Sequence, residues 1–215
     1  MVLRLDSIEY MISAVETGQF LPPDRPEIAF SGRSNVGKSS LLNLLTQRRG
    51  LAKVSKTPGK TRAVNFFDVD GKWRLVDLPG YGYARLSKKE IERWGRVVDS
   101  YLRDRPNLAG IIQLIDARHD PTRLDLEMIE WFALTRIPTI IALTKTDKIR
   151  KNLRRNLPER FGKTWLGDLG WPVVPTSAEK REGRDRLLGE VEVLLARAGM
   201  ENGPVEEPET GGSLT

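Results

Sequence analysis

GRSNVGKS, at residues 32–39, is the most informative short stretch of this chain. It fits the pattern G-x-x-x-x-G-K-[ST], and it lies between an apolar run at Ile28–Ser31 and a leucine-rich stretch with helical spacing at Ser39–Gln47. The glycines allow backbone N–H groups to converge on phosphate oxygens, and the helix that follows adds a favourable dipole. The stretch therefore predicts a strand, a phosphate-binding loop and a helix.

Two residues of this loop have a distinct expected role. We expect Lys38 to offer its charge to the β- and γ-phosphates of a nucleotide and Ser39 to ligate Mg²⁺. The predicted nucleotide contacts of the loop are Gly32, Arg33, Ser34, Asn35, Val36, Gly37, Lys38, Ser39 and Ser40.

A second motif of the D-x-x-G type follows another predicted strand. The carboxylate of such a motif holds Mg²⁺, and the glycine N–H can sense the γ-phosphate. We expect Asp77 to be the metal ligand and Gly80 to take part in catalysis together with Lys38. The predicted contacts are Asp77, Leu78, Pro79 and Gly80.

Two later motifs indicate which nucleotide base is bound. Thr144-Lys145-Thr146-Asp147 ends an apolar strand and matches T-K-x-D, a variant of the guanine-reading N-K-x-D in which Thr144 replaces the usual Asn. The Asp147 carboxylate can accept hydrogen bonds from N1–H and the 2-amino group of guanine, and adenine offers neither donor in that arrangement. Lys145 is expected to pack its stem over the nucleotide. The last strand is followed by three further predicted contacts, Thr176, Ser177 and Ala178.

Strand and helix patterns alternate along the chain, which indicates a mostly parallel sheet with helices on both faces. Asp70-Gly71 between two strands predicts a hairpin, and hence one antiparallel edge. We expect a six-stranded sheet. Strands are predicted at 28–31, 64–69, 73–78, 110–115, 139–143 and 172–174, and helices near 39–47, 88–104, 122–134, 149–161 and 184–198.

Composition restricts the remaining choices. The 215 residues suit one domain and include no cysteine and a single histidine, His119, which excludes disulfides and zinc sites built from these residues. No stretch is apolar enough to span a membrane, and no signal-peptide core opens the chain, so we expect a cytoplasmic location and no membrane partner. We expect an N-terminal extension at 1–25 that packs on the domain, a nucleotide-binding domain at 26–199 and a disordered acidic tail at 200–215. Within the extension, Leu3–Glu16 is expected to be a short strand or helix at the edge of the domain.

The net charge is +6, although residues 201–215 hold four glutamates and neither Lys nor Arg. The rest of the chain is therefore near +10 and favours an anionic partner such as nucleic acid. Either phosphate contacts or an ordinary solvated surface would explain the basic clusters. These clusters lie at 48–62, at Lys88, Lys89, Arg93 and Arg96, and at Arg150, Lys151, Arg154 and Arg155. The five tryptophans are scattered and are expected to pack the core and helices, not to stack on bases.

The motifs together resemble the translation-factor-related GTPases, and the run Asp77–Ala84 resembles the EngB family specifically. Thr57–Thr61 and Asn65–Phe67 strengthen this resemblance, which covers roughly residues 5–198. It implies a Ras-like α/β fold that binds GTP or GDP with Mg²⁺ and hydrolyses GTP as a switch. It also implies a role in assembly of the bacterial large ribosomal subunit, with a ribosomal precursor as partner, a link to septation and cell division, and a monomeric chain.

The resemblance assigns further residues. Thr61 matches the switch threonine that joins Mg²⁺ when the γ-phosphate is present, with Thr57 as the alternative, inside the predicted contact stretch Gly59, Lys60, Thr61, Arg62 and Ala63. Tyr81 stands where Ras-like proteins place a water-orienting glutamine, so slow intrinsic hydrolysis is expected. Asn35 suggests a K⁺ ion beside the phosphates, the alternative being that Asn35 only bonds within its loop.

Two other functions remain open at this point. A P-loop kinase for a small molecule would share the phosphate loop, but it would leave Thr144–Asp147 without a purpose. An RNA-binding module with a lapsed P-loop would not need Lys38, Ser39, Asp77 and Asp147 intact.

Overall fold

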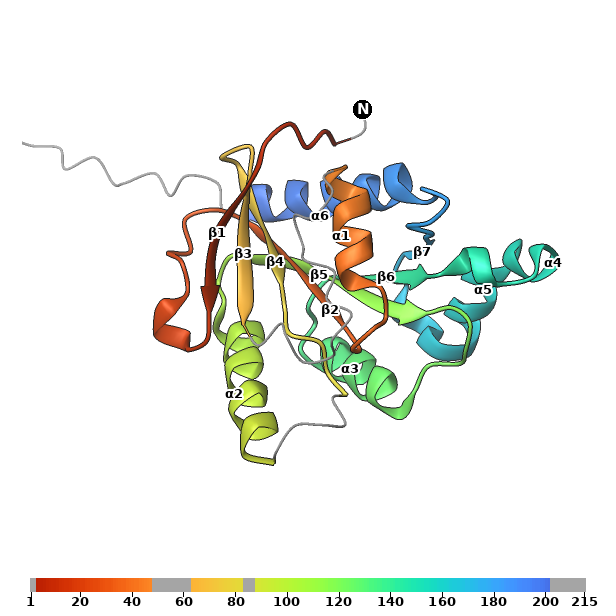
Figure 1. Cartoon of the computed structure of the whole chain (residues 1–215), viewed down its shortest axis with the longest axis horizontal. Helices are drawn as coiled ribbons and strands as arrows, with labels where there is room; N and C mark the ends of the chain where they lie inside the picture. The colour runs from red at the N-terminus through yellow and green to blue at the C-terminus, as the bar shows by residue number, and fades with distance from the viewer. Residues whose placement is uncertain (1–2, 48–62, 83–87, 202–215) are drawn as a thin grey trace, which may run out of the picture.

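The computed structural model describes residues 3–47, 63–82 and 88–201, with the side chains of 88–94 and 200–201 excepted (Figure 1). The predicted contacts at 59–62, the basic loop at 48–62, Tyr83 and most of the acidic tail lie outside these ranges. Among the helices within them, none has the length and apolar composition needed to cross a bilayer.

The centre of the fold is a seven-stranded sheet with the order β1-β3-β4-β2-β5-β6-β7. The prediction of an α/β fold with a mostly parallel sheet is confirmed, but the predicted count of six strands is wrong. The additional strand is β1, which pairs antiparallel with β3; only its end residues, Ile8 and Ala14, are buried, so its sequence lacks a regular apolar alternation. The strands are Ile8–Ala14 (β1), Glu27–Gly32 (β2), Val64–Val69 (β3), Trp73–Asp77 (β4), Leu108–Asp116 (β5), Thr139–Thr144 (β6) and Val173–Pro175 (β7).

The antiparallel edge is built by the predicted hairpin. β3 and β4 pair from Val69–Trp73 to Asn65–Asp77. Asp70 and Gly71, between them, both have positive φ, 54° and 65°. Two consecutive left-handed residues are what a type I′ turn requires, and Asp-Gly supplies them at little cost. Lys72 N–H donates to the Val69 carbonyl across this turn at 3.0 Å and completes a three-residue connection.

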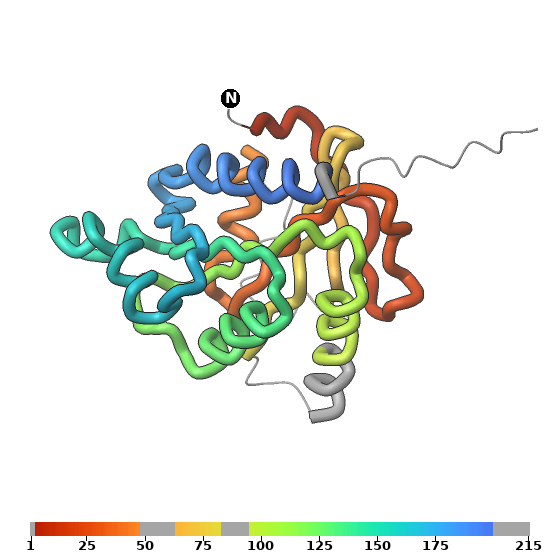
Figure 2. Tube along the Cα trace, turned by 180° about the vertical axis from the view of Figure 1, so that it is seen from behind, coloured from red at the N-terminus to blue at the C-terminus, as the bar shows by residue number. Residues whose placement is uncertain are grey.

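Helices cover both faces of the sheet (Figures 1 and 2). Buried residues of α1 and α6 share one core cluster with Ile28 and Phe30 of β2, whereas α2 and α3 pack on the other face with Ala29. This alternation along β2 is the period-two pattern of a strand buried on both sides. The helices are Lys38–Thr46 (α1), Lys88–Asp104 (α2), Arg123–Leu134 (α3), Lys151–Arg154 (α4), Leu157–Phe161 (α5) and Arg184–Glu201 (α6).

The helix predicted at 149–161 is instead two short helices, α4 and α5. Pro158 explains the break, because a proline inside a helix removes one hydrogen bond and clashes with the carbonyl four residues earlier. Pro158 is tolerated near the start of α5. A π-helical turn, Gly162–Leu166, continues from α5 and ends at Gly167.

The end of β2 remote from the P-loop holds a buried carboxylate. Glu27 is fully buried and accepts hydrogen bonds from Arg105 Nε (2.8 Å) and from the Tyr101 hydroxyl (2.9 Å). Arg74 lies at 3.4 Å from the same side chain. A buried charge that is paired and hydrogen-bonded in this way is structural.

Candidate guanine-nucleotide site

The phosphate-binding loop connects β2 to α1, as predicted. Gly37, just before α1, has φ of 109°, and Asn35 has φ of 62°. Gly32 is needed for a different reason: a Cβ there would lie 2.9 Å from Cγ1 of Val36 and 3.0 Å from Cβ of Leu114. Glycine is therefore required at position 37 by the backbone conformation and at position 32 by close packing.

Lys38 and Asp77 meet inside the site. The Lys38 ammonium donates to Oδ1 of Asp77, and the two side chains are 10% and 5% exposed. A buried lysine needs an anionic partner, and a buried carboxylate needs a cation. The residues predicted to bind phosphate and Mg²⁺ therefore neutralise each other where the first residue of α1 meets the last residue of β4.

A hydrogen-bonded chain reaches Asp77 from the sheet edge. Asn65 of β3 donates from Nδ2 to Oδ2 of Asp77 at 3.4 Å. Ser13 of β1 donates to Oδ1 of Asn65 at 2.6 Å, and the Tyr10 hydroxyl lies 2.8 Å from Oγ of Ser13. The amide of Asn65 is thus held from one side while it orients the carboxylate on the other.

The loop after β4 lies directly against the P-loop. Tyr81 N–H donates to the Gly32 carbonyl (3.3 Å), and Ser34 N–H donates to the Tyr81 carbonyl (2.9 Å). Gly80, the residue before Tyr81, is tightly packed, because a Cβ there would lie 3.1 Å from the Ser34 nitrogen. Gly80 is therefore placed beside the loop predicted to hold the phosphates.

The Tyr81 phenol is held by residues of β5 and α3. Its hydroxyl donates to Oδ1 of Asp125 at 2.7 Å and accepts from Nε2 of Gln113 at 2.6 Å. Burial, and then the neighbouring Asp125 carboxylate, raise the pKa of Tyr81 well above its usual range. The side chain that replaces the Ras-like glutamine is thus a neutral, fully engaged phenol.

The predicted guanine loop follows β6. Lys145 has φ of 57°, and its ammonium donates to the Asn35 carbonyl (2.7 Å) and to Oδ2 of Asp116 (2.9 Å). Thr144 donates from Oγ1 to the Val36 carbonyl at 2.6 Å. Thr144 therefore does tie this loop to the P-loop, although it lacks the amide of the usual Asn.

Asp116, at the end of β5, was not predicted to belong to the site. It accepts hydrogen bonds from Lys145 and, through both carboxylate oxygens, from Arg118 at 2.9 and 2.7 Å. Burial alone would raise the pKa of Asp116, but Arg118 and Lys145 hold it well below its usual range. Asp116 thus fixes the long stem of Lys145.

The base-reading carboxylate is held by its neighbours. Ser177 Oγ donates to Oδ1 of Asp147 at 2.7 Å and lowers the pKa of that carboxyl, helped by Lys148. Thr146 Oγ1 donates to the Thr176 carbonyl at 3.0 Å, which joins the two loops. Arg154 donates from its NH2 nitrogen to the Asp147 carbonyl at 2.7 Å.

The structure thus gathers the four described motifs at one edge, the carboxyl ends of β2, β4, β6 and β7, where open α/β sheets bind ligands. Of the predicted switch stretch only Ala63 is described, and it is buried just before β3. Sequence patterns did not point to the supporting residues Asp116, Arg154, Asp125 and Gln113, and Asn65 entered only through the resemblance.

Comparison with known proteins identifies the family. The model of a family described as 50S ribosome-binding GTPase matches residues 27–145. A "Probable GTP-binding protein EngB" of Halothermothrix orenii is 47% identical over 86% of this chain and 94% of its own length. The chain belongs to the EngB family of GTP-binding proteins. A second EngB protein, from Clostridium perfringens, is 51% identical over 86% of this chain and 94% of its own.

Solved structures agree with the fold. The crystal structure of a probable GTP-binding protein engB superposes with a TM-score of 0.64 and covers 80% of this chain and 99% of its own, and its 23% identity supports the fold alone. A variant of S. thermophilus NFeoB bound to GMPPNP is 29% identical, with a TM-score of 0.56, over 85% of this chain and 66% of that chain.

Membership of the EngB family decides between the functions left open by the sequence. The chain is a P-loop GTPase that binds guanine nucleotides, and the small-molecule kinase and the lapsed P-loop are both wrong. The predicted fold, a Ras-like sandwich with an antiparallel edge, is confirmed with the one additional strand.

Proposed function

We propose that this GTPase is a cytoplasmic switch that binds GTP or GDP with Mg²⁺ and acts, as a monomer, on a precursor of the large ribosomal subunit. Loss of the protein would then disturb septation and cell division through a shortage of ribosomes. The observation that carries the switch is that the Lys38–Asp77 pair and the Asp147 carboxylate held by Ser177 lie at the same edge of the sheet in an EngB-family chain.

Guanine selection rests on Asp147. Its Oδ1 already accepts from Ser177, and carboxylate oxygens have further lone pairs for the N1–H and 2-amino donors of guanine. Adenine would leave the carboxylate without these donors. A site built around such buried acceptors can discriminate by about 10⁴.

The residues present fit a Mg²⁺ ion. The described ranges hold no group of three or more His, Cys, Asp or Glu side chains suited to a metal. Mg²⁺ in nucleotide sites is usually held by one or two protein oxygens together with phosphates and water. Ser39 and Asp77 would be those oxygens, joined by Thr61, and the ion would neutralise charge on the phosphates.

Lys38 and Gly80 would act on the phosphates. When phosphates enter, the Lys38 ammonium gains a stronger anionic partner and releases the Asp77 carboxylate for the metal. The Gly80 N–H would then bond the γ-phosphate. Because the Tyr81 phenol is bonded to Asp125 and Gln113, no glutamine-like group orients water from this position, and intrinsic hydrolysis should be about 10⁻⁴ s⁻¹.

A K⁺ ion near Asn35 would supply part of the missing charge. Asn35 is exposed at the mouth of the loop, in a left-handed conformation. The hypothesis predicts faster hydrolysis in KCl than in NaCl at equal ionic strength. Equal rates in the two salts would refute it.

The base assignment is tested by Asp147→Asn. The variant should lose about 10⁴-fold in GTP affinity, and it should gain affinity for xanthosine triphosphate, whose carbonyl at C2 accepts from the new amide. Asp168→Asn, a loss of an exposed carboxylate elsewhere, is the matched control. Competition between fluorescent GDP and ATP is the measurement, and displacement by ATP as readily as by GTP would contradict guanine specificity.

The ribosomal role is tested by co-sedimentation. The wild type loaded with a non-hydrolysable GTP analogue should sediment with large-subunit particles more strongly than the GDP form. Contacts between basic residues and RNA phosphates should weaken steeply with added salt. Binding that ignores both nucleotide and salt would overturn this part of the proposal.

A further inference from the structure

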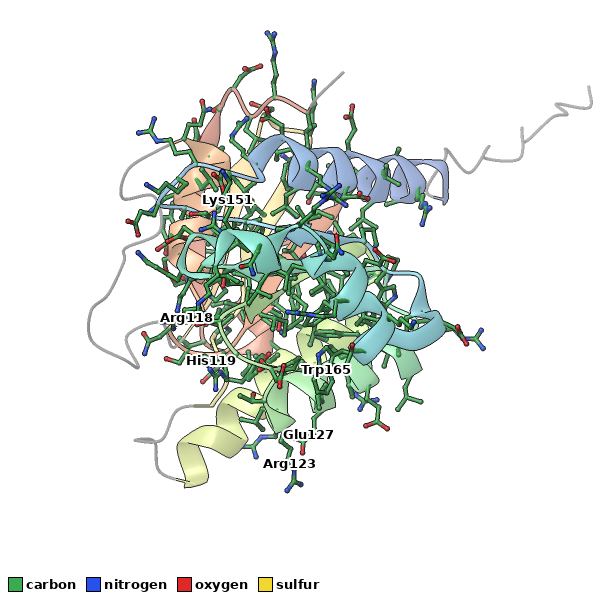
Figure 3. All side chains as sticks on the ribbon, turned by 90° about the vertical axis from the view of Figure 1, so that its right-hand side faces the viewer. Arg118, His119, Arg123, Glu127, Lys151 and Trp165 are labelled. Carbon is green, nitrogen blue, oxygen red and sulfur yellow. The ribbon has the colours of Figure 1, made fainter. Side chains whose placement is uncertain are left out.

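A cavity of about 560 Å³ lies near the guanine loop, between the loop that follows β5 and the helices that follow β6. One wall is the loop 117–121, after β5, and the other is formed by α5 and the π-helical turn, with Leu143 between them. Cavities of this size hold small ligands. We call it the lateral cavity; Figure 3 faces this end of the molecule and shows Arg118 and His119 on one side and Trp165 on the other.

The second wall of the lateral cavity is one continuous helical stripe. Leu157, Arg160, Phe161, Thr164 and Trp165 follow the spacing i, i+3, i+4, i+7, i+8 and all line the cavity. Leu157 and Phe161 are buried and form an apolar floor, whereas Arg160 and Thr164 are exposed at the rim. The π-helical turn that carries Thr164 and Trp165 is a rare element that is often found at functional sites.

The charges of the lateral cavity favour a neutral ring over a free anion. Arg118 is already paired with Asp116, and Asp120 adds a carboxylate to the lining, which leaves Arg160 as a cation without a described acid against it. A free phosphate ion would therefore gain little binding energy in this cavity. A flat ring would gain contact with Phe161 and Trp165, while its polar edge could bond Thr164, His119 or Asp120.

We propose that the lateral cavity binds one unpaired nucleotide of single-stranded RNA, with its base beside Trp165 and its phosphate at Arg160. Unpaired bases that enter aromatic-lined pockets are the usual basis of selective RNA recognition by proteins. The ribose hydroxyls would face Asp120. This proposal rests on the ribosomal role above and revises the expectation that all five tryptophans only pack the core.

The cavity also has a route to the nucleotide site. Arg118 lines it, and the same Asp116 carboxylate that accepts from Arg118 accepts from Lys145. A ligand that breaks the ion pair between Arg118 and Asp116 would change the hydrogen bond between Asp116 and Lys145. RNA binding and guanine-nucleotide binding should then alter each other's affinity by the same factor.

The test is fluorescence anisotropy of labelled RNA pentamers with the full chain loaded with a GTP analogue. Single-stranded pentamers should bind, and duplexes of equal length and free mononucleotides should bind far more weakly. Trp165→Leu should weaken binding about tenfold or more, and Trp165→Phe, which keeps a ring, should restore most of it. Arg160→Ala should weaken binding several-fold, whereas Arg197→Ala, an equal charge loss on exposed α6, should not.

Guanine-nucleotide affinity and the melting temperature show that each variant is folded, and Arg160, being exposed, should not disturb either. Equal RNA binding by the wild type, Trp165→Leu and Arg160→Ala would overturn the proposal, as would no binding by the wild type or equal binding of duplexes. Co-sedimentation separates the two claims. If all these variants sediment with large-subunit particles as the wild type does, the cavity proposal fails and the ribosomal role stands; if the wild type does not sediment, the ribosomal role fails.

Discussion

The hydroxyl of Tyr81 lies 2.7 Å from Oδ1 of Asp125, a residue that also caps the N-terminus of α3. Oδ2 of the same carboxylate accepts from the Thr122 backbone N–H and hydroxyl, at 2.8 and 2.6 Å. One buried carboxylate thus joins the loop that carries Gly80 to the start of a helix on the far side of the sheet. The tyrosine at this position anchors the loop that carries Gly80 to α3.

Tyr81→Phe should therefore affect stability more than chemistry. It leaves Asp125 and Gln113 each without one hydrogen-bond partner in a buried place, which should cost about 1–2 kcal/mol of unfolding free energy. The single-turnover hydrolysis rate should change by less than about threefold, since the hydroxyl is already bonded to Asp125 and Gln113. Urea denaturation and single-turnover assays measure the two effects. A hundredfold loss of rate would instead make Tyr81 a catalytic residue.

Arg154 and Arg155 look equivalent in the sequence but should behave differently. Arg154 donates to the carbonyls of Ile149 (2.8 Å) and Asp147 (2.7 Å), so it holds the guanine loop closed, whereas Arg155 is exposed. Arg154→Ala should weaken GDP binding about fivefold to tenfold, the effect of losing about 1–1.5 kcal/mol of hydrogen bonding. Arg155→Ala should leave it unchanged. Equal GDP dissociation constants for the two variants would show that the Arg154 contacts do not support the loop.

Sequence patterns predicted what depends on local chemistry. A P-loop needs its glycines at fixed positions, and a tight hairpin turn needs two left-handed residues, which Asp70 and Gly71 supply. These motifs therefore predicted the strand–loop–helix unit and the hairpin. The edge strand β1 was harder to predict, because an exposed strand has little apolar alternation, and its pairing with β3 links residues fifty or more positions apart. The break at Pro158 was available from the sequence but was missed.

The supporting residues of the site could not be predicted in this way. These side chains act through partners on other strands and helices, and the residues next to them in the sequence do not indicate those partners. This is true of Asp116, Asn65 and Asp125. Arg154 was grouped with surface cations because charge alone does not show whether a guanidinium meets RNA or a backbone carbonyl. These assignments required the tertiary structure.

Asn65→Ala should raise the Mg²⁺ concentration needed for tight nucleotide binding. Asn65 orients Asp77 through Oδ2, and its loss would let the carboxylate turn or remain with Lys38. Changes to residues that orient metal ligands typically cost tenfold or more in metal affinity. Ser13→Ala, which removes only the outer hydrogen bond to Asn65, should have a smaller effect. A Mg²⁺ titration of fluorescent GDP binding gives the measurement, and identical midpoints for wild type and Asn65→Ala would contradict the orienting role.

Asp116→Asn should reduce stability in a way that depends on pH. The folded pKa of Asp116 lies below its unfolded value of about 3.9, since Arg118 and Lys145 stabilise the carboxylate against the opposing effect of burial. A depressed folded pKa contributes stability that is present above the unfolded value and is lost as the pH falls through the folded one. The variant should therefore be less stable than the wild type by about 2 kcal/mol between pH 5 and 7, and this difference should shrink below about pH 4. Urea denaturation from pH 3 to 7 measures it, with Asp120→Asn, an exposed neighbour, as the control. A difference that stays constant down to pH 3 would mean that the charge of Asp116 is not what stabilises the loop, and that the shape of its hydrogen bonds with Arg118 and Lys145 is sufficient.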